Sequence, residues 1–501
     1  MKKVIIIGAG IAGLTTGCHL QMMGYETEII EKHSIAGGLC TSWNRSGYRF
    51  DGCIHWLLGS DRGSAFYGLW SELIDMEKIE FVNHSERVTI EVKEHVDRYG
   101  SKLFHLYTDL DKLEKYLMDL SSADAEPIRE LIASIRYLQK FELPPLADKA
   151  PAVRTVWDQL KMVKYIPFLV FMKKWNNITN VKFAQRFHDP FLKEAFELLF
   201  EDKEFTMLAM TMQLAYFSMG CAGYPIGGSY EFAKHLEERY NSLGGIIRYN
   251  SGVRKILTRD NTAVGIETEN HQTVEGDIIV SAADWNYTIF QALEGKYTDQ
   301  TILKLREQKV YEVFESEVLI SVGVKGAFDQ MPHLLRFPLE DPIRLEDGSE
   351  YDRMEAHIYN YDRTMAPDGK TTISVSLTAQ NADYWIELRQ KDYEGYKAAK
   401  EKLGKDVIDR LDQKFGRIRD CVEVTDVATP ATFNRYTGNW KGSIQGWMPS
   451  GDLFAPSSVR HVLPGLKNFY MTGHWMETGG GLPVALMMGR NVAYRINQQD
   501  R

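Results

Sequence analysis

Three glycines and one glutamate near the N-terminus carry the clearest chemistry in this sequence. Gly8, Gly10 and Gly13 follow the apolar run 4–7, and Glu31 stands 18 residues beyond the third glycine. In such a turn the first glycine reverses the chain, the second lets amides approach a pyrophosphate, and the third allows close helix packing. The helix N-terminus adds partial positive charge, and the acid accepts ribose hydroxyls. The pattern predicts a dinucleotide site.

The elements around these glycines favour binding over a purely structural turn. We expect a buried strand over 4–7, a helix that ends near Gly24, and a second strand over 27–30. A glycine motif alone would leave the structural alternative open, whereas strand, helix and acid in the right order favour a binding site. The basic first residues suggest a secretory signal, but the apolar run ends too early, at Gly8.

A Gly-Gly pair shortly after the acid extends this pattern. Gly37 and Gly38 are followed by the hydroxyl residue Thr41. This arrangement resembles the extended fingerprint of FAD-binding flavoproteins, whose glycine loop lies along the dinucleotide towards the flavin. Residues 47–59, with His55, are similar to the strand and loop that run beneath the flavin ring. A plain glycine-rich connection is the alternative.

A second glycine cluster lies near the C-terminus. A short predicted strand ends at Gly473, and three glycines, at 479–481, precede a predicted helix. Backbone amides at a helix N-terminus suit a pyrophosphate or a ring carbonyl. Because similar glycine turns lie at both ends of the sequence, we expect both chain ends to meet at one cofactor.

The middle of the chain completes a family resemblance. Apolar alternation predicts short strands over 246–249, 253–257, 263–268 and 273–280. Together with Ser281–Asp284 and the stretch that begins at Thr429-Pro430, these motifs resemble the phytoene desaturase, carotenoid isomerase and retinol saturase branch of the amine-oxidase-like flavoproteins. The matching motifs, at 4–59, 224–284 and 429–493, frame the whole chain.

The resemblance implies an activity and a set of site residues. It implies an FAD-dependent oxidoreductase that desaturates, saturates or isomerises a C–C or C=C bond of a lipophilic polyene or isoprenoid-like substrate. The candidate proton donors or acceptors are His55, His474 and Glu477, and a structural role is the alternative for each histidine. The loop 474–477 is larger and more ionisable than expected of desaturases, which leaves the reaction open. The residues expected to bind FAD are Gly8, Gly10, Ile11, Ala12, Gly13, Glu31, Lys32, Gly37, Gly38, Leu39, Thr41, His55, Val253, Ala282, Gly473, Gly480, Gly481, Leu482 and Pro483.

Two other functions stay open. The first is an amine-oxidase or protoporphyrinogen-oxidase-like flavoenzyme, which would have an aromatic pair facing the flavin. The second is a non-enzymatic isoprenoid carrier of the Rab GDP-dissociation-inhibitor type, which shares the fold but uses no flavin. The sequence has no second G-x-G-x-x-G and no C-x-x-x-x-C. An enzyme of this kind therefore needs an external electron donor or acceptor, unless it isomerises its substrate.

The remaining segments predict the architecture. Helical spacing covers 109–143 and 151–201, strand-like runs cover 318–324 and 371–377, and an amphipathic helix covers 393–415. The predicted fold class is α/β: a discontinuous Rossmann-like FAD-binding domain plus an α+β substrate domain with an antiparallel sheet and a helical cap. We expect the first domain at 1–60, 221–300 and 429–501, and the second at 61–220 and 301–428.

Composition excludes several other classes. The 501 residues carry a net charge of -9, which argues against nucleic-acid binding, and the five cysteines lack metal-ligand spacing. No apolar run reaches the roughly 20 residues of a spanning helix, so we expect a cytoplasmic protein. The lysine-flanked stretch 161–175 predicts either a helix at a membrane surface, giving peripheral membrane contact, or an ordinary buried helix. The uncharged, methionine-rich stretch 205–219 predicts a core helix or a lipophilic tunnel.

Overall fold

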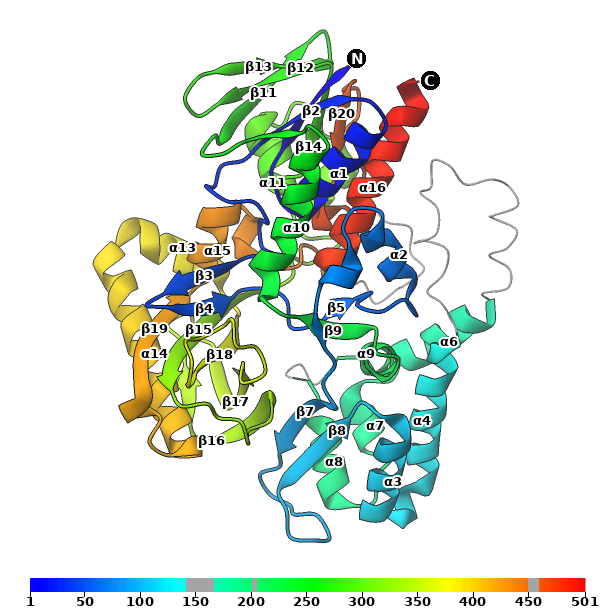
Figure 1. The fold of residues 1–501 in the computed structure, drawn as a ribbon, viewed down its shortest axis with the longest axis vertical. Helices are drawn as coiled ribbons and strands as arrows, with labels where there is room; N and C mark the ends of the chain where they lie inside the picture. Colours follow the sequence, from blue (N-terminus) through cyan, green and yellow to red (C-terminus); the bar gives the residue numbers. More distant parts are fainter. Residues whose placement is uncertain (141–165, 201–204, 449–458, 501) are drawn as a thin grey trace.

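A parallel sheet carries the dinucleotide motifs. The structure is a computed structural model that describes residues 1–140, 166–200, 205–448 and 459–500. In this part of the chain, five strands pair in parallel in the order β10-β2-β1-β14-β20. They are drawn from widely separated segments, so both chain ends reach one sheet (Figure 1). Their bounds are β1 Lys3–Ile7, β2 Glu26–Ile30, β10 Ile246–Arg248, β14 Ile278–Ser281 and β20 Phe469–Met471.

Helix α1 (Ile11–Met22) packs closely against two other helices beside this sheet, α10 (Gly228–Ser242) and α16 (Gly481–Asp500). A Cβ added at Gly489 of α16 would lie 2.6 Å from the carbonyl oxygen of Ala12 on α1. A Cβ at Gly17 of α1 would lie 2.5 Å from the ring of Tyr240 on α10. Glycine at 489 therefore lets α16 approach α1 within backbone contact, and glycine at 17 leaves room for the ring of Tyr240.

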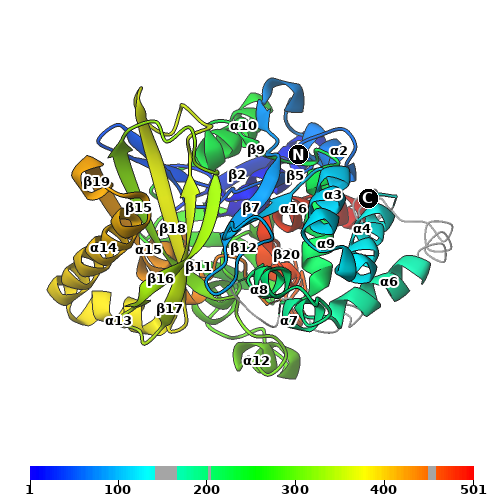
Figure 2. The ribbon, with the colours of Figure 1, turned by 90° about the horizontal axis from the view of Figure 1, so that it is seen from below.

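A second sheet lies beside the first (Figures 1 and 2). Within the described residues it has seven strands in the order β19-β15-β18-β17-β16-β7-β8, antiparallel except for the β16–β7 pair. Helices α13 (Ala382–Lys391) and α14 (Tyr393–Phe415) contribute to its apolar core. The strands are β7 Glu86–Glu91, β8 Leu103–Tyr107, β15 Ser316–Lys325, β16 Leu334–Arg344, β17 Glu350–Ile358, β18 Lys370–Ala379 and β19 Val422–Ala428.

A helical unit packs next to the β7–β8 edge (Figure 2). It has an apolar core of its own, built from leucine and phenylalanine side chains. Its helices are α3 Leu110–Leu120, α4 Ala125–Gln139, α6 Ile166–Asn176, α7 Asn180–Ala184, α8 Pro190–Glu197 and α9 Met207–Ser218. Helix α9 buries Met207 and Met210, which supports the prediction of a core helix there.

The lysine-flanked stretch 161–175 is only partly described. Residues 161–165 lie outside the described residues, and the rest forms most of α6. Phe168 and Trp175 are buried, whereas Ile166 and Val170 are 53% and 65% exposed. The helix thus anchors one side in the core and presents apolar side chains outward. No helix in the described residues is long and apolar enough to cross a bilayer.

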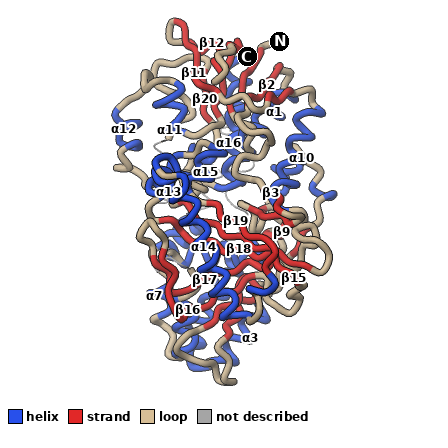
Figure 3. The backbone as a smooth tube through the Cα atoms, turned by 90° about the vertical axis from the view of Figure 1, so that its left-hand side faces the viewer, coloured by secondary structure: helices blue, strands red, loops and turns tan. Residues whose placement is uncertain are grey.

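Smaller elements connect these parts (Figure 3). The predicted strand 273–280 is divided: its first part joins a separate antiparallel sheet, its last part joins the parallel sheet, and Gly276 lies between them. The predicted α/β fold class is confirmed, whereas the division into two discontinuous domains stays a prediction. The remaining strands are β3 Ser42–Arg45, β4 Tyr48–Asp51, β5 Leu57–Leu58, β6 Phe81–Val82, β9 Ala222–Pro225, β11 Val253–Arg259, β12 Thr262–Thr268 and β13 Thr273–Glu275. The remaining helices are α2 Ala65–Ser71, α11 Trp285–Tyr287, α12 Gln300–Arg306 and α15 Pro430–Thr437, with a π-helical turn at Thr288–Ala292 and 3-10 turns at Met76–Lys78, Ser122–Asp124, Arg419–Cys421, Trp440–Gly442 and His474–Met476.

Candidate functional site

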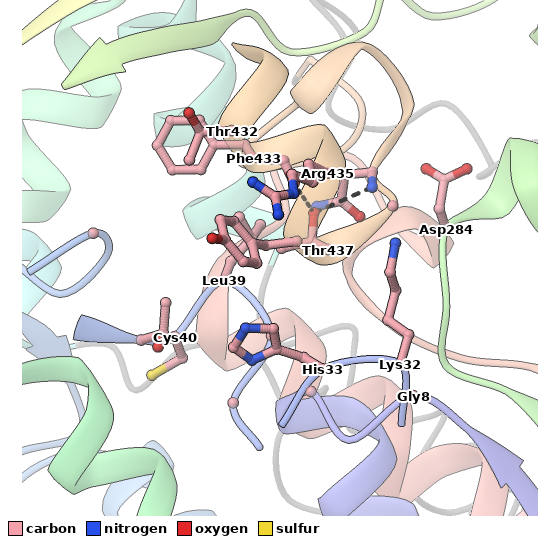
Figure 4. A pocket seen from close by; sticks show the side chains of 18 of the residues that line it. Gly8, Lys32, His33, Leu39, Cys40, Asp284, Thr432, Phe433, Arg435 and Thr437 are labelled. Carbon is pink, nitrogen blue, oxygen red and sulfur yellow. Dashed lines mark hydrogen bonds between the residues drawn. The ribbon is translucent and has the colours of Figure 1, made fainter. Parts of the chain in front are cut away.

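A cavity of about 540 Å³ lies at the carboxyl ends of β1 and β2. This is the edge of a parallel sheet where α/β proteins bind nucleotides, and the volume is in the range of small-molecule sites. Its walls come from the glycine turn, the segment after β2, helix α15 and the C-terminal glycine loop (Figure 4). Segments from both chain ends therefore line one space, as the two glycine clusters predict.

The N-terminal turn needs its glycines for different reasons. Gly8 has a φ of 97°, a left-handed conformation that favours glycine. A Cβ at Gly13 would overlap the carbonyl oxygen of Gly8. Gly10, in contrast, has an ordinary φ of -69°, and a Cβ there would have no protein atom closer than 4.0 Å. Neither backbone nor packing demands glycine at position 10, so an added side chain would only take space from the cavity.

Glu31 is held at the end of β2 by two backbone amides. Its Oε2 accepts a hydrogen bond from the amide of Ala9 (2.6 Å) and its Oε1 accepts one from the amide of His33 (2.7 Å). Burial raises the pKa of Glu31, and the two amide hydrogen bonds act in the opposite direction. The carboxylate lines the cavity in a fixed orientation and keeps lone pairs for ribose hydroxyls.

The Gly-Gly loop lies directly against the first turn. The amide of Gly37 donates to the carbonyl of Ala9 at 2.9 Å, and Gly10 pairs with Gly37 as an isolated bridge. Gly37 and Gly38 both have positive φ, and a Cβ at Gly37 would overlap the carbonyl of Cys40. The two glycine segments thus form one continuous backbone wall.

The glycines Gly473, Gly480 and Gly481 near the C-terminus do not have the same role. Gly473 and Gly481 line the cavity, the second as the first residue of α16. Gly480 does not line it; a Cβ there would overlap the carbonyl of Gln445. The N-terminus of α16 therefore opens towards the cavity, while Gly480 serves close packing.

Most residues predicted to bind the cofactor line this cavity. Four do not: Gly13, His55, Gly480 and Pro483. Their predicted contact with the cofactor stays a prediction, and for two of them packing already explains the glycine. The predicted residues that line the cavity are Gly8, Gly10, Ile11, Ala12, Glu31, Lys32, Gly37, Gly38, Leu39, Thr41, Val253, Ala282, Gly473, Gly481 and Leu482.

Of the three predicted proton donors or acceptors, only His474 lines the cavity. Its Nε2 is buried and has no hydrogen-bond partner among the described residues. Desolvation lowers the pKa of His474 to about 4, so the ring is neutral at pH 7. Glu477 lies beside the cavity lining, accepts a hydrogen bond from the amide of Thr478, and has its pKa raised by burial. His55 packs against His357 instead, with ring centroids 4.1 Å apart.

Helix α15 contributes a wall of the cavity; the sequence places residues 429–501 in the FAD-binding domain but predicts no site residue on this helix. It begins with a capping box between Thr429 and Thr432, with Pro430 in the first turn. Thr-Pro ahead of a helical pattern is the signal that could have located it. Figure 4 shows Arg435 above His33, with Lys32 to one side. The additional lining residues include Arg45, Asp284, Arg389, Tyr393, Lys400, Asp426, Thr432, Phe433, Arg435, Tyr436 and Thr437.

Asp284 connects this wall to the parallel sheet. Its Oδ1 accepts from the amide of Tyr287 (2.7 Å) and its Oδ2 from the amide of Trp440 (2.8 Å). Burial raises the pKa of this carboxyl to about 6. The residue therefore fixes the loop after α15 to the end of β14.

The geometry defines a dinucleotide-binding Rossmann-like domain joined to a second, antiparallel sheet. Residues 6–73 match the family described as NAD(P)-binding Rossmann-like domain. The chain is 26% identical to the chloroplastic prolycopene isomerase of Daucus carota, over 98% of this chain and 79% of that protein. It is 22% identical to the 4,4'-diapophytoene desaturase (4,4'-diapolycopene-forming) of Methylomonas sp, over 100% and 96%. These relatives confirm the resemblance that the sequence motifs indicate.

Solved structures share the fold across the whole chain. A triple mutant of putrescine oxidase superposes with a TM-score of 0.58 at 13% identity, covering 99% of this chain and 98% of that one. A Rab GDI from Plasmodium falciparum superposes with a TM-score of 0.52 at 10% identity, covering 98% of each chain. The fold is thus shared by oxidases and by a protein of another class, so the site must decide the function.

Proposed function

We propose that this protein binds FAD and acts as an oxidoreductase on a C–C or C=C bond of a lipophilic, polyene or isoprenoid-like substrate. The observation that carries the proposal is the open space at Gly10. Neither the backbone conformation nor the packing requires glycine at this position, and a side chain there would enter the cavity. The carotenoid desaturases and isomerases among the relatives support the reaction class.

The residues of the cavity fit a flavin dinucleotide. The turn from Gly8 to Gly13 and the N-terminus of α16 would hold the pyrophosphate with backbone amides and helix dipoles. Glu31 would accept the ribose hydroxyls, and its charge would repel a 2′-phosphate. When bound, the flavin supplies a two-electron acceptor or donor for hydride transfer. The basic side chains of Arg45, Arg389, Lys400 and Arg435 at the cavity would offset the phosphate charges.

His474 is the residue best placed to handle a proton. Its neutral ring lines the cavity and its Nε2 is unpartnered in the described chain, so this nitrogen is available to a substrate carbon or to a bound ring. Trp475 packs beside it, with ring centroids 5.6 Å apart, and limits its orientation. Desaturation would require an external acceptor, saturation an external donor, and isomerisation neither.

The first test is the visible absorbance of the purified protein, before and after addition of FAD. A flavin spectrum that persists after desalting is expected. A protein that stays colourless would favour the isoprenoid-carrier alternative, since that class uses no flavin. Oxidation of an amine instead of a polyene would favour the amine-oxidase alternative.

The exposed apolar residues of α6 support a further part of the proposal, a cytoplasmic protein that takes its substrate from a membrane surface.

A further inference from the structure

A second group of ionisable side chains lies around strands β7, β16 and β17 of the seven-stranded sheet. None of its members lines the dinucleotide cavity. It brings together four imidazoles, two guanidinium groups and one carboxylate from four separate stretches of the chain. We call it the His–Arg cluster: His55, His84, Arg87, His333, Arg336, Glu355 and His357.

The single carboxylate of the cluster is already engaged. Glu355 on β17 stands opposite Arg336 on β16 in the strand register, and the two form an ion pair. Glu355 also pairs with His357 Nε2 at 3.3 Å, and Arg336 donates a further hydrogen bond to the carbonyl of Leu198 at 2.6 Å. The ring of His357 in turn lies 4.1 Å from that of His55. Arg336 and Glu355 thus satisfy each other.

Arg87 makes no such close ion pair in the described part of the chain, although the charge of Glu355 acts to raise its pKa. Its Nε donates to Oε1 of Gln213 at 3.3 Å, and its guanidinium lies over the ring of Phe217 at 5.5 Å. No hydrogen bond joins its terminal nitrogens to a residue in the described part of the chain. Desolvation lowers the pKa of Arg87, although a guanidinium stays charged at neutral pH. Glu355 raises the pKa of Arg87 and Arg336 lowers it, so Arg87 shares one carboxylate with a second guanidinium group. The group keeps an excess positive charge, which an anionic ligand would offset.

The histidines add no compensating negative charge. His84 and His333 stack with ring centroids 3.6 Å apart, and the Nε2 of His84 is buried without a partner among the described residues. Desolvation lowers the pKa of His84 to about 4 and that of His333 to about 2, so both rings are neutral at pH 7. Two guanidinium groups therefore face one carboxylate, and the neutral rings can donate hydrogen bonds to an anion.

His55 connects the His–Arg cluster to the dinucleotide cavity. Its ring is exposed, yet desolvation lowers its pKa well below the usual range. The ring is exposed to solvent and also packs against the ring of His357. Gly52 and Cys53, just before it in the chain, line the dinucleotide cavity. A bound molecule that extends from the Gly52–Cys53 side of that cavity along His55 would meet the cluster.

We propose that the His–Arg cluster binds the carboxylate end of a lipophilic polyene or isoprenoid acid, with Arg87 contacting the carboxylate directly. This inference deepens and rests on the proposed function, because it assigns a polar end to the substrate of the same site. The planar guanidinium matches a carboxylate through two parallel hydrogen bonds. Phe217, under the guanidinium, and Trp56, whose ring lies 5.6 Å from that of Phe217, provide the apolar surface that the adjoining hydrocarbon needs.

The test compares three ligands with one carbon skeleton on the FAD-loaded protein: retinoic acid, retinol and the hydrocarbon axerophthene. Tryptophan fluorescence quenching gives the equilibrium affinity of each. We expect the wild type to bind the acid at least about 10-fold more tightly than the hydrocarbon, because only the acid pairs with Arg87. Arg87→Met should remove this preference and leave hydrocarbon affinity within about 2-fold. Arg87→Lys should restore part of it, since the charge returns without the planar fork.

A matched control variant shows whether an effect on binding depends on the position of Arg87 or on the loss of any one arginine. Arg98 is an arginine with 57% of its side chain exposed, so Arg98→Met should change neither affinity. A wild-type protein that does not prefer the acid, or that binds none of the probes, overturns the proposal even if Arg87→Met fails to fold. Equal loss of acid and hydrocarbon binding in Arg87→Met overturns it as well. Failure of the proposed function shows separately, as a missing flavin spectrum in the wild type.

Discussion

The dinucleotide cavity and the His–Arg cluster are built from different parts of the polypeptide. The cavity owes its shape to backbone: glycine turns, one helix N-terminus and a carboxylate held by two amides. The His–Arg cluster consists of side chains on strands and loops of the second sheet. A backbone site suits a cofactor that different enzymes of one fold share, whereas a side-chain site suits a ligand particular to one chain. Substrate choice should therefore respond to the cluster, and cofactor retention to the turns.

The largest effect should come from filling the cavity at Gly10. Gly10→Leu should lower FAD affinity at least about 100-fold, because the side chain takes the space needed for close backbone approach. Folding should lose about 1 kcal/mol or less, since φ is ordinary and no protein atom obstructs the Cβ. FAD titration and thermal unfolding measure the two effects. Gly68→Leu on α2 is the control, because a Cβ there meets nothing within 4 Å.

Gly13→Ala should weaken folding as well as FAD binding, unlike the change at Gly10. Its Cβ would overlap the carbonyl oxygen of Gly8, so the strand and α1 must separate. Overpacking of this kind costs about 1–3 kcal/mol, and the apoprotein should melt earlier as well as bind FAD less tightly. Equal melting temperatures for the two glycine variants would contradict the division between ligand space and packing.

Replacing His474 tests whether this residue donates or accepts the proton during the reaction. His474→Gln should lower turnover by about 10²–10⁴ while FAD binding persists. His461→Gln is the matched control, because His461 is partly buried, its Nδ1 donates to the carbonyl oxygen of Met471, and it does not line the cavity. Since the pKa of His474 is lowered to about 4, wild-type turnover should be flat from about pH 6 to 8 and fall only as pH drops towards 4. A rate that titrates near pH 6.5 would argue against this residue.

The lowered pKa of His474 also determines how the stability of the fold depends on pH. A histidine whose folded pKa is depressed takes up its proton more readily in the unfolded chain. Its stabilising contribution is therefore complete above about pH 6.5 and is lost as pH falls towards the folded pKa of about 4. Urea unfolding at pH 7 and pH 5 should show a smaller acid-induced loss in His474→Gln than in the wild type.

The two regions also differ in how far sequence predicts them. Gly8, Gly10, Gly13 and Glu31 lie within one strand–helix–strand unit, so local spacing is enough to assign them. Arg87, Arg336 and Glu355 come together only when β7, β16 and β17 pair, and no short motif joins them. None of these three strands is predicted from the sequence, whose strand-like runs in the second domain are 318–324 and 371–377. Pro338 and a register shift after it interrupt the alternation that would have indicated β16.

Local patterns are also silent on what each glycine contacts. Gly479, Gly480 and Gly481 look equivalent in the sequence, yet Gly481 lines the cavity and Gly480 packs on Gln445. His55 and His474 both follow glycines, yet only His474 lines the cavity. The tertiary neighbours that decide these roles lie outside any local motif: Gln445 is 35 residues from Gly480, and His357 is 302 residues from His55.

A smaller effect is expected at Glu31. In Glu31→Gln an amide NH₂ must face the backbone N–H of Ala9 or of His33, so one buried hydrogen bond becomes a repulsion between donors. Hydrogen bonds to charged groups contribute about 1.5–3 kcal/mol, so FAD affinity should fall about 10- to 100-fold. Glu28→Gln is the control: Glu28 lies on β2 and pairs with Lys3, but does not line the cavity. Equal losses of FAD affinity in both variants would place the effect in the sheet instead of the site.

The smallest effect concerns α6, which lies in the same helical unit as α9, the helix that bears Phe217 beneath Arg87. Val170 is 65% exposed, so Val170→Glu should change the free energy of unfolding by less than about 0.5 kcal/mol. If this face lies on a bilayer, the charge should weaken sedimentation with anionic lipid vesicles by about 3- to 10-fold. Val96→Glu is the control, a loop valine that is 51% exposed. Wild-type protein that stays in the supernatant would show that α6 has only a structural role. The substrate would then have to arrive through water, a route that is open to an amphiphilic acid but not to a carotenoid hydrocarbon.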